Sequence, residues 1–218
     1  MADAGHIILL GAPGVGKGTQ AKVISADLGL PHVSTGDMLR ASVAAGSEMG
    51  KRAKAVMESG ALVNDEIILA IVSERLREMD AQNGVVFDGF PRTVVQAEGL
   101  DRLLTDSGGV PIGHILHIVL EDDVIVDRLS GRRLCRDCGA IYHVRFQPPK
   151  VDGRCDRCGG ELFQRDDDQP AVIRHRLAVY TAETAPLVSL YRGRAGYAEI
   201  DGNGSSVAVT DRIRGFLG

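Results

Sequence analysis

The sequence predicts a doubly wound α/β fold built on a mostly parallel, five-stranded sheet. Short apolar runs alternate along the chain with longer segments in which apolar residues recur every three to four positions. Three of the apolar runs are followed directly by small, polar or charged residues, as happens where ligands bind at the carboxyl ends of parallel strands. The 218 residues are enough for one domain with inserts and a full hydrophobic core.

The elements follow from local patterns taken in chain order. The strands are expected at 7–10, 31–34, 84–88, 114–120 and 197–200. The helices are expected at 17–28, 38–43, 47–57, 64–76, 93–104, 123–130, 169–191 and 206–217. Ser47, Asn64 and Asp122 are the expected helix caps, Gly29 should end the first helix, and Pro186 should kink the long one. Between residues 131 and 168 the periodicity disappears, and no regular element is expected.

The stretch GAPGVGKGTQ, residues 11–20, lies between the first strand and the first helix. Glycines allow positive φ and bring backbone N–H groups close to an anion, and a helix N-terminus adds a partial positive charge. The spacing from Gly11 to Lys17 fits a phosphate-binding P-loop, in which the lysine reaches the outer phosphates of a nucleotide. Gly18 stands where Ser or Thr is usual, and the hydroxyl follows at Thr19. The alternative is a glycine-rich turn that only joins two elements.

Overall charge and composition exclude several classes of protein. Hydrophobic residues make up 44% and charged residues 25%, which is typical of a globular domain, and the net charge of −4 argues against a general nucleic-acid binder. Residues 1–6 contain no basic segment before a short apolar run, so no signal peptide is expected. No apolar stretch approaches the ~20 residues that span a bilayer. A cytoplasmic protein without a membrane partner is therefore expected.

Four cysteines form two Cys-x-x-Cys pairs. Cys135 and Cys138 are separated by sixteen residues from Cys155 and Cys158, which fits a common zinc-binding pattern. Four thiolates leave no open coordination position, so the expected Zn²⁺ is structural and not catalytic. Two alternatives are a pair of disulfides and a zinc ribbon that binds nucleic acid. Residues 131–168 contain eight Lys or Arg against seven Asp or Glu, a balance that argues against a nucleic-acid surface.

Seven arginines lie near the expected ligand-binding loops or beside the cysteine segment. A reaction between two polyphosphates must offset much negative charge, and guanidinium groups do this well because they bind phosphate in a bidentate manner. The seven are Arg40, Arg92, Arg128, Arg132, Arg133, Arg165 and Arg176.

With these motifs in hand, the chain closely resembles the adenylate kinase family. The P-loop, including Gly18, is similar to that family's loop, and residues 34–40 (STGDMLR) and 88–93 (DGFPRT) resemble its two nucleoside-monophosphate signatures. Residues 165–168 and 174–176 resemble the return from the family's lid, and the four cysteines resemble the long-lid, zinc-bearing bacterial type. The similarity covers nearly the whole chain.

The resemblance implies transfer of the ATP γ-phosphoryl group to AMP, giving two ADP, with Mg²⁺ bound together with ATP. It implies that Asp88 orients water around Mg²⁺, and that Arg165 and Arg176 bridge the two nucleotides. The implied ATP contacts are Gly14, Val15, Gly16, Lys17, Gly18, Thr19, Arg128, Arg132, Ile141, Tyr142 and Gly204. Gly204 departs from the family's usual basic residue, so a contact there must use the backbone.

The implied AMP contacts surround the second and third strands. They are Thr35, Arg40, Ala61, Leu62, Val63, Gly89, Phe90, Pro91, Arg92, Gln96, Arg165 and Arg176. Gln96 has one acceptor and one donor group, which suits the N1 and N6 edge of adenine if its neighbours fix the amide orientation. Lys17, Arg92, Arg132, Arg165, Arg176 and Asp88 are the residues to which the resemblance gives catalytic roles.

The same resemblance implies a monomer with two mobile inserts on a P-loop core. The core is expected at 1–33, 64–130 and 169–218, the AMP-binding insert at 34–63 and the zinc-binding lid at 131–168. Two other readings stay open at this point. One is a kinase for a different monophosphate, such as UMP or GMP, and the other is a zinc-ribbon binding module with a nucleotide-gated P-loop.

Overall fold

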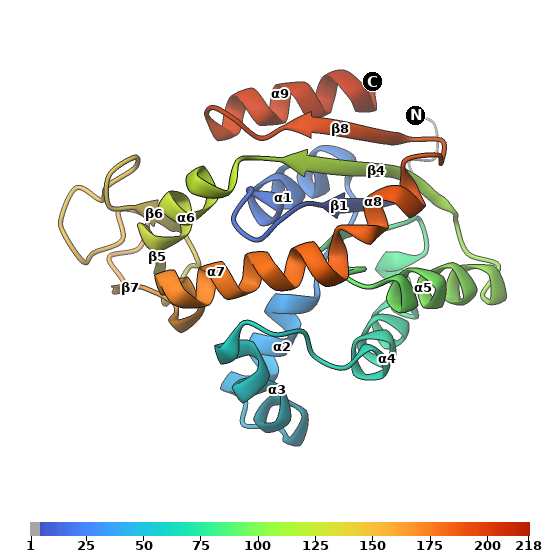
Figure 1. Ribbon diagram of the computed structural model, residues 1–218, viewed down its shortest axis with the longest axis horizontal. Helices are drawn as coiled ribbons and strands as arrows, with labels where there is room; N and C mark the ends of the chain where they lie inside the picture. Colours follow the sequence, from blue (N-terminus) through green and yellow to red (C-terminus); the bar gives the residue numbers. More distant parts are fainter. Residues whose placement is uncertain (1–4) are drawn as a thin grey trace.

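A computed structural model describes residues 5–218 and contains a central five-stranded sheet in the order β2-β3-β1-β4-β8 (Figure 1). All four neighbouring pairs are parallel, which confirms the predicted class. The strands are β1 (His6–Leu10), β2 (His32–Ser34), β3 (Val86–Asp88), β4 (Ile112–Val119) and β8 (Tyr197–Asp201).

Helices pack on both faces of this sheet. They are α1 (Lys17–Leu28), α2 (Thr35–Ala44), α3 (Glu48–Ser59), α4 (Asp65–Leu76), α5 (Val94–Asp106), α6 (Asp122–Ser130), α7 (Pro170–Val179), α8 (Pro186–Tyr191) and α9 (Ser206–Leu217). Short 3₁₀ turns lie at Met79–Ala81 and Asp166–Asp168.

The core has two layers because side chains of β1 alternate between the faces of the sheet. Ile7 and Leu9 pack in a cluster with residues of α1, α6, α7 and α9. Ile8 and Leu10 pack in a second cluster with residues of α4, α5 and α8. All four side chains are at most 3% exposed, so β1 is the buried centre of the fold and holds the loop that follows it in place.

Two expected helix starts were wrong. The helix expected at 38–43 starts earlier, because α2 begins at Thr35 and the hydroxyl of Ser34 caps it by accepting from the Asp37 N–H at 3.3 Å. Asp122 was expected as a cap, but it lies in the first turn of α6, where its carboxylate still favours the positive end of the helix dipole. Glu121 occupies the N-cap position with extended backbone and makes no side-chain cap bond.

The expected long helix is interrupted before Pro186. A π-helical segment, Tyr180–Thr184, separates α7 from α8, and the Ala185 N–H donates to the Tyr180 carbonyl at 2.8 Å. Pro186 has no N–H and sits in the first turn of α8, where none is needed. The expected kink is therefore present as a wider turn that displaces the second half of the helix.

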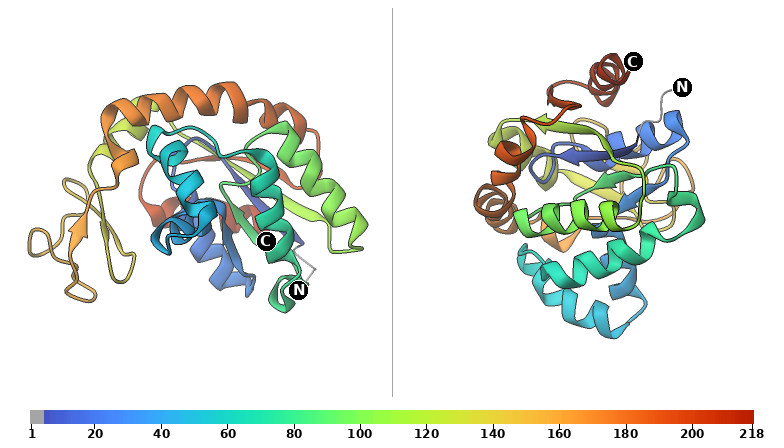
Figure 2. Two further views of the ribbon diagram at one scale, coloured as in Figure 1. Left: turned by 90° about the horizontal axis from the view of Figure 1, so that it is seen from below. Right: turned by 90° about the vertical axis from the view of Figure 1, so that its right-hand side faces the viewer.

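Residues 131–168 contain a small antiparallel sheet that the sequence analysis missed. Its order is β6-β5-β7, with β5 (Arg132–Cys135), β6 (Ile141–His143) and β7 (Leu162–Phe163). Strands of two to four residues are too short to show a period of two, which explains the omission. This segment stands out from the core at one end of the molecule, and α2 with α3 protrudes on another side (Figures 1 and 2).

Among the described residues, no helix combines the length and apolar character needed to cross a membrane. The expectation about a signal peptide depends largely on residues 1–4, which lie outside the described part of the chain.

Candidate functional site

The phosphate-binding loop joins β1 to α1 and has the conformation that its glycines predict. Gly16 is the N-cap residue of α1 with φ of 106°, and Gly11 has φ of 136°. A Cβ on Gly11 would lie 2.3 Å from the Ile118 carbonyl oxygen, so only glycine fits where β1 meets β4. The Lys17 ammonium donates to the carbonyls of Gly11 and Ala12 at 2.7 and 2.8 Å, which folds its side chain over the loop.

Gly18, which stands where a hydroxyl residue is usual, lies against the carboxylate of Asp88. A Cβ at this position would lie 3.0 Å from Oδ2 of Asp88, at the end of β3. The missing side chain thus lets the carboxylate approach the start of α1. His32 lies on the other side of this carboxylate, with Nε2 3.4 Å from Oδ2.

Electrostatics at this point favour a bound anion. Burial, together with the charges of Arg92, Arg176 and Arg132, lowers the pKa of Lys17 from 10.5 to about 7, although Asp88 opposes the shift. Burial alone would raise the pKa of Asp88, but contact with His32 and the charge of Lys17 hold it below its ordinary value. Burial also lowers the pKa of Arg176 to about 10. The site therefore combines an ionised carboxylate with more positive groups than it can balance.

One cavity of about 990 Å³ brings most of the expected site residues together. The P-loop forms its floor, the ends of β2 and β3 form one wall, and the β5–β6 segment and the loop after β8 form the opposite end. The charged residues that line it are Lys17, Lys22, Asp37, Arg40, Asp88, Arg92, Arg128, Arg132, Arg165 and Arg176. Arginines from α2, α6, α7 and three connecting or lid segments thus converge on one space.

Two aspartates at the end of the lid hold three of these arginines. Arg132 binds Asp168 in a bidentate manner at 2.8 and 2.7 Å, and the Asp168 side chain is fully buried. Arg165 binds Asp167 through Nε and Nη2, and Nη1 of Arg176 lies 3.0 Å from the same carboxylate. A guanidinium has five N–H donors, so a bidentate pair leaves donors for a phosphate. The aspartates therefore orient the arginines without using up their capacity.

Sequence reasoning gave no role to Asp167 and Asp168. The signal was present, since both follow Arg165 directly in a run of three acids, but acids beside arginines are common on solvated surfaces. What the sequence does not show is that Asp168 is buried, and a buried carboxylate requires a charged partner.

The other expected arginines also have hydrogen-bond or ion-pair partners. The Nη2 of Arg40 lies 2.5 Å from Asp37, one turn earlier on α2. The Nε of Arg92 donates to the Gly89 carbonyl at 2.7 Å, and Arg128 donates to the carbonyls of Gly202 and Gly204 at 3.1 and 3.3 Å. Arg133 donates to the carbonyls of Ser130 and Arg132, and it does not line the large cavity.

A smaller recess of about 60 Å³ opens beside the cavity. It is lined by Thr35, Gly36, Leu39, Arg40, Met57, Gly60, Ala61, Leu62, Val63, Ile68, Gly89, Arg92, Gln96, Arg165, Asp167 and Arg176. The hydroxyl of Thr35 donates to the Gly89 carbonyl at 3.0 Å, which ties α2 to the loop after β3. Most residues expected to contact the acceptor nucleotide therefore share this recess.

Gln96 is buried in this recess with its amide orientation fixed. Its Oε1 accepts from the Arg92 N–H at 2.8 Å, and its Nε2 donates to Asp65 at 2.7 Å. A flipped amide would place oxygen against carboxylate and N–H against N–H, so the observed orientation is strongly favoured.

Two expected contact residues have partners outside the cavity. Phe90 is fully buried and packs against Phe87 in the core, with ring centroids 5.5 Å apart. Tyr142 is 6% exposed, and its hydroxyl accepts from the Asp156 N–H at 2.7 Å and lies 3.5 Å from Cys155 Sγ. Tyr142 nevertheless lines the cavity together with Ile141, which is exposed.

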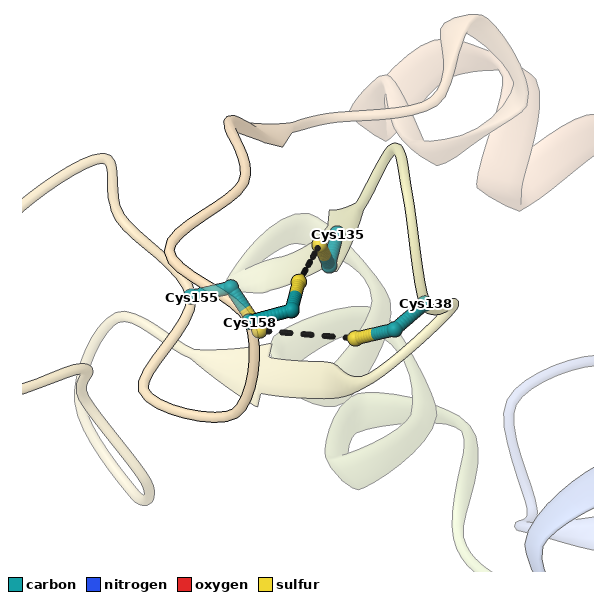
Figure 3. Close-up of side chains that lie close together, drawn as sticks. All are labelled: Cys135, Cys138, Cys155 and Cys158. Carbon is teal, nitrogen blue, oxygen red and sulfur yellow. Dashed lines mark hydrogen bonds between the residues drawn. The ribbon is translucent and has the colours of Figure 1, made fainter.

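The four cysteines gather at the end of β5 and in the turns beside the lid sheet, where their Sγ atoms all lie within 4.8 Å of one another (Figure 3). Cys135 and Cys158 are 3.4 Å apart at sulfur, and Cys138 and Cys155 are 3.5 Å apart. Zn–S bonds of about 2.3 Å in a tetrahedron require sulfurs about 3.8 Å apart, close to these separations. The residues fit a structural zinc site, and within the described chain these thiols form no disulfide.

Comparison with known proteins agrees with this geometry. The model of the family described as adenylate kinase matches residues 9–195. An adenylate kinase of Syntrophotalea carbinolica is 50% identical over 97% of this chain and 98% of its own. Those of Archaeoglobus fulgidus and Salinispora tropica are 46% and 47% identical, over 97% and 98% of this chain and 97% and 100% of theirs. The chain therefore belongs to the adenylate kinase family and is a nucleoside-monophosphate kinase, a phosphotransferase that binds nucleotides.

Proposed function

We propose that the enzyme reversibly transfers the γ-phosphoryl group of ATP to AMP, giving two ADP, inside the cavity above the P-loop. One observation carries the proposal: a single cavity lies above the P-loop, a smaller recess opens beside it, and Arg165 and Arg176 line both. Two anionic nucleotides that meet end to end would need this distribution of charge.

The donor nucleotide would lie along the P-loop. Lys17 and the loop amides would hold its outer phosphates, and Thr19 would lie near the inner ones. Arg132 and Arg128 would contact the phosphates and base end from the lid side, where both line the cavity. Ile141 would cover the base, and Gly204 would contribute its backbone. Tyr142 would cover the base beside Ile141, and its hydroxyl, which contacts the cysteine site, would hold it in place.

The acceptor would occupy the smaller recess. Arg40, Arg92 and Thr35 would bind its phosphate, and residues 61–63 would line its base and ribose. Arg165 and Arg176 line both the cavity and the recess, so they would reach the transferred group from both nucleotides. The acceptor phosphate is already anionic, and positioning with charge stabilisation suffices without a general base.

Mg²⁺ would accompany ATP at Asp88. This carboxylate is ionised and lies beside Gly18, where it would orient water ligands of the ion. Bound Mg²⁺ neutralises charge on the β- and γ-phosphates. Zn²⁺ would serve only the lid, because four thiolates close its coordination sphere.

We also propose that residues 34–63 and 131–168 move toward the core when both nucleotides bind. Both segments carry arginines or apolar residues that line the cavity, and closure would exclude water until the acceptor is present. Hydrogen exchange with and without a bisubstrate analogue of two linked adenosines tests this. Protection should rise in both segments, and unchanged exchange would contradict closure.

A panel of acceptors tests the choice of AMP. With its orientation fixed, Gln96 has one N–H for adenine N1 and one lone pair for the N6 amino group, and guanine presents the opposite polarity. The wild-type kcat/KM should favour AMP over GMP by about 100-fold or more, and Gln96→Leu should remove most of that preference. Equal efficiency of the wild type with AMP, GMP and UMP would contradict the assignment.

A further inference from the structure

Gln20, the last residue of the P-loop motif, has no role in the reaction proposed above. It lies on α1 one residue after Thr19, and it is 2% exposed. A buried amide requires partners for both its oxygen and its nitrogen, and the partners that it has are 186 and 190 residues away in the sequence.

These partners belong to the first two turns of α9. Nε2 of Gln20 donates to the Ser206 carbonyl at 3.0 Å and lies 3.3 Å from the Ser206 hydroxyl. The Thr210 hydroxyl lies 2.8 Å from Oε1 of Gln20 and 2.9 Å from the Ser206 carbonyl. Thr210 is itself 6% exposed, so the whole arrangement is shielded from water.

The start of α9 is also one end of the cavity. Residues 203–206 line it, and Ser205 caps α9 by accepting from the Ala208 N–H at 3.2 Å. Gly204 has φ of 96° and no side chain, so only its backbone can hold this segment in place. Arg128 supports the same segment from α6 through the Gly202 and Gly204 carbonyls.

We infer that Gln20 is a positioning residue that fixes residues 203–206 against the P-loop helix and so shapes the base end of the donor site. The inference rests on the proposed function, which puts ATP on the P-loop. Through one buried amide, the element that holds the phosphates also sets the position of the segment that meets the base. Gln20 also lines the cavity, but both ends of its amide are engaged with α9, so it acts through that helix.

The test compares Gln20→Leu, Thr210→Val and Thr210→Ser with the wild type. The fold should tolerate Gln20→Leu because leucine has nearly the shape of glutamine. In this variant the Thr210 hydroxyl can still donate to the Ser206 carbonyl. Gln20→Leu should raise KM for ATP by about three- to tenfold, the effect expected from one or two lost hydrogen bonds, with kcat and KM for AMP within about twofold. Thr210→Val should act in the same direction, and Thr210→Ser, which keeps the hydroxyl, should restore the wild-type value.

Two controls separate positioning from general loosening. Asp27 lies two turns after Gln20 on α1 and joins α9 through an exposed bidentate pair with Arg214, away from the cavity. Asp27→Asn should leave both KM values unchanged. Inorganic tripolyphosphate, which has no base, should inhibit Gln20→Leu and wild type with equal inhibition constants.

The outcomes separate the two proposals. If wild-type protein does not phosphorylate AMP, the proposed function fails before the variants are compared. If the wild type is active and Gln20→Leu raises both KM values alike, leaves KM for ATP unchanged, or weakens inhibition by tripolyphosphate, Gln20 does not position the base end and the inference is overturned.

Discussion

Binding of a polyphosphate should make the protein take up a proton at Lys17. The pKa of Lys17 is lowered to about 7 by burial and by three neighbouring arginines, so above pH 7 the free protein holds this side chain mostly uncharged. Phosphates bring negative charge to the site and restore the ammonium form. Because the pKa is lowered in the free protein and raised on binding, uptake should grow as pH rises through 7.

The magnitude follows from the same pKa. With a value of about 7, roughly a quarter of Lys17 is protonated at pH 7.5 and about nine tenths at pH 6. Uptake should then be about three quarters of a proton per ATP at pH 7.5 and about one tenth at pH 6. Recharging the side chain costs only about 0.8 kcal/mol at pH 7.5, so it does not prevent binding.

Isothermal titration calorimetry of Mg-ATP in buffers of different ionisation enthalpy measures this uptake. Lys17→Arg is the matched control, since a guanidinium stays charged at every pH used and should abolish the uptake while retaining the positive charge. Heats that do not depend on the buffer at pH 7.5 would refute the reasoning. So would the same uptake in Lys17→Arg, which would assign the proton to another group.

Three further predictions concern stability. Burial lowers the pKa of His6 from 6.5 to about 4, so the contribution of neutral His6 to the free energy of unfolding is full above pH 6.5 and is lost as the pH falls toward 4. Denaturant melts should show a loss of about 3 kcal/mol over this range, and His6→Gln should flatten the dependence of stability on pH. Arg132→Met leaves buried Asp168 with only the more distant Arg176, whose Nη1 lies at 3.7 Å, and should lower the free energy of unfolding by about 3–5 kcal/mol in chemical denaturation. Adding Asp168→Leu should recover most of this loss, and equal stability of the single and double variants would contradict the prediction. Cys138→Ser, or a strong chelator, should lower the melting temperature and remove about one metal ion per chain, as measured by atomic spectroscopy, while turnover well below the melting temperature falls only modestly. An unchanged melting temperature after metal loss would disprove the structural role of the metal.

The main features of the fold were predictable because each has a local cause. The alternation of apolar runs with helical periodicity fixed five strands and their parallel pairing, and the caps at Ser47 and Asn64 are present as expected. Two features could not be predicted. The π-helical segment before Pro186 depends on the packing of α7 and α8, and the short strands of the lid depend on pairings between distant residues.

The site was predictable where a motif contains its own geometry. The P-loop and the two cysteine pairs do, because the spacing of their residues is itself the pattern that phosphate or metal binding requires. The buried partners Asp168 and Thr210 were not predictable, since neither burial nor contact with a residue 36 or 190 positions away is visible in the chain order. Tyr142 shows the same limit, because its burial against the cysteine site depends on the folded lid.

Incubation of the purified enzyme with Mg²⁺ and ADP alone tests the central claim most directly. A cavity that accepts two nucleotides end to end should convert ADP into ATP and AMP in equal amounts, without release of inorganic phosphate. Chromatography of the nucleotides with a phosphate assay on the same sample measures all the products. Formation of AMP and ATP at a ratio of one would support the account, whereas unchanged ADP, or ADP hydrolysed to AMP and phosphate, would contradict it.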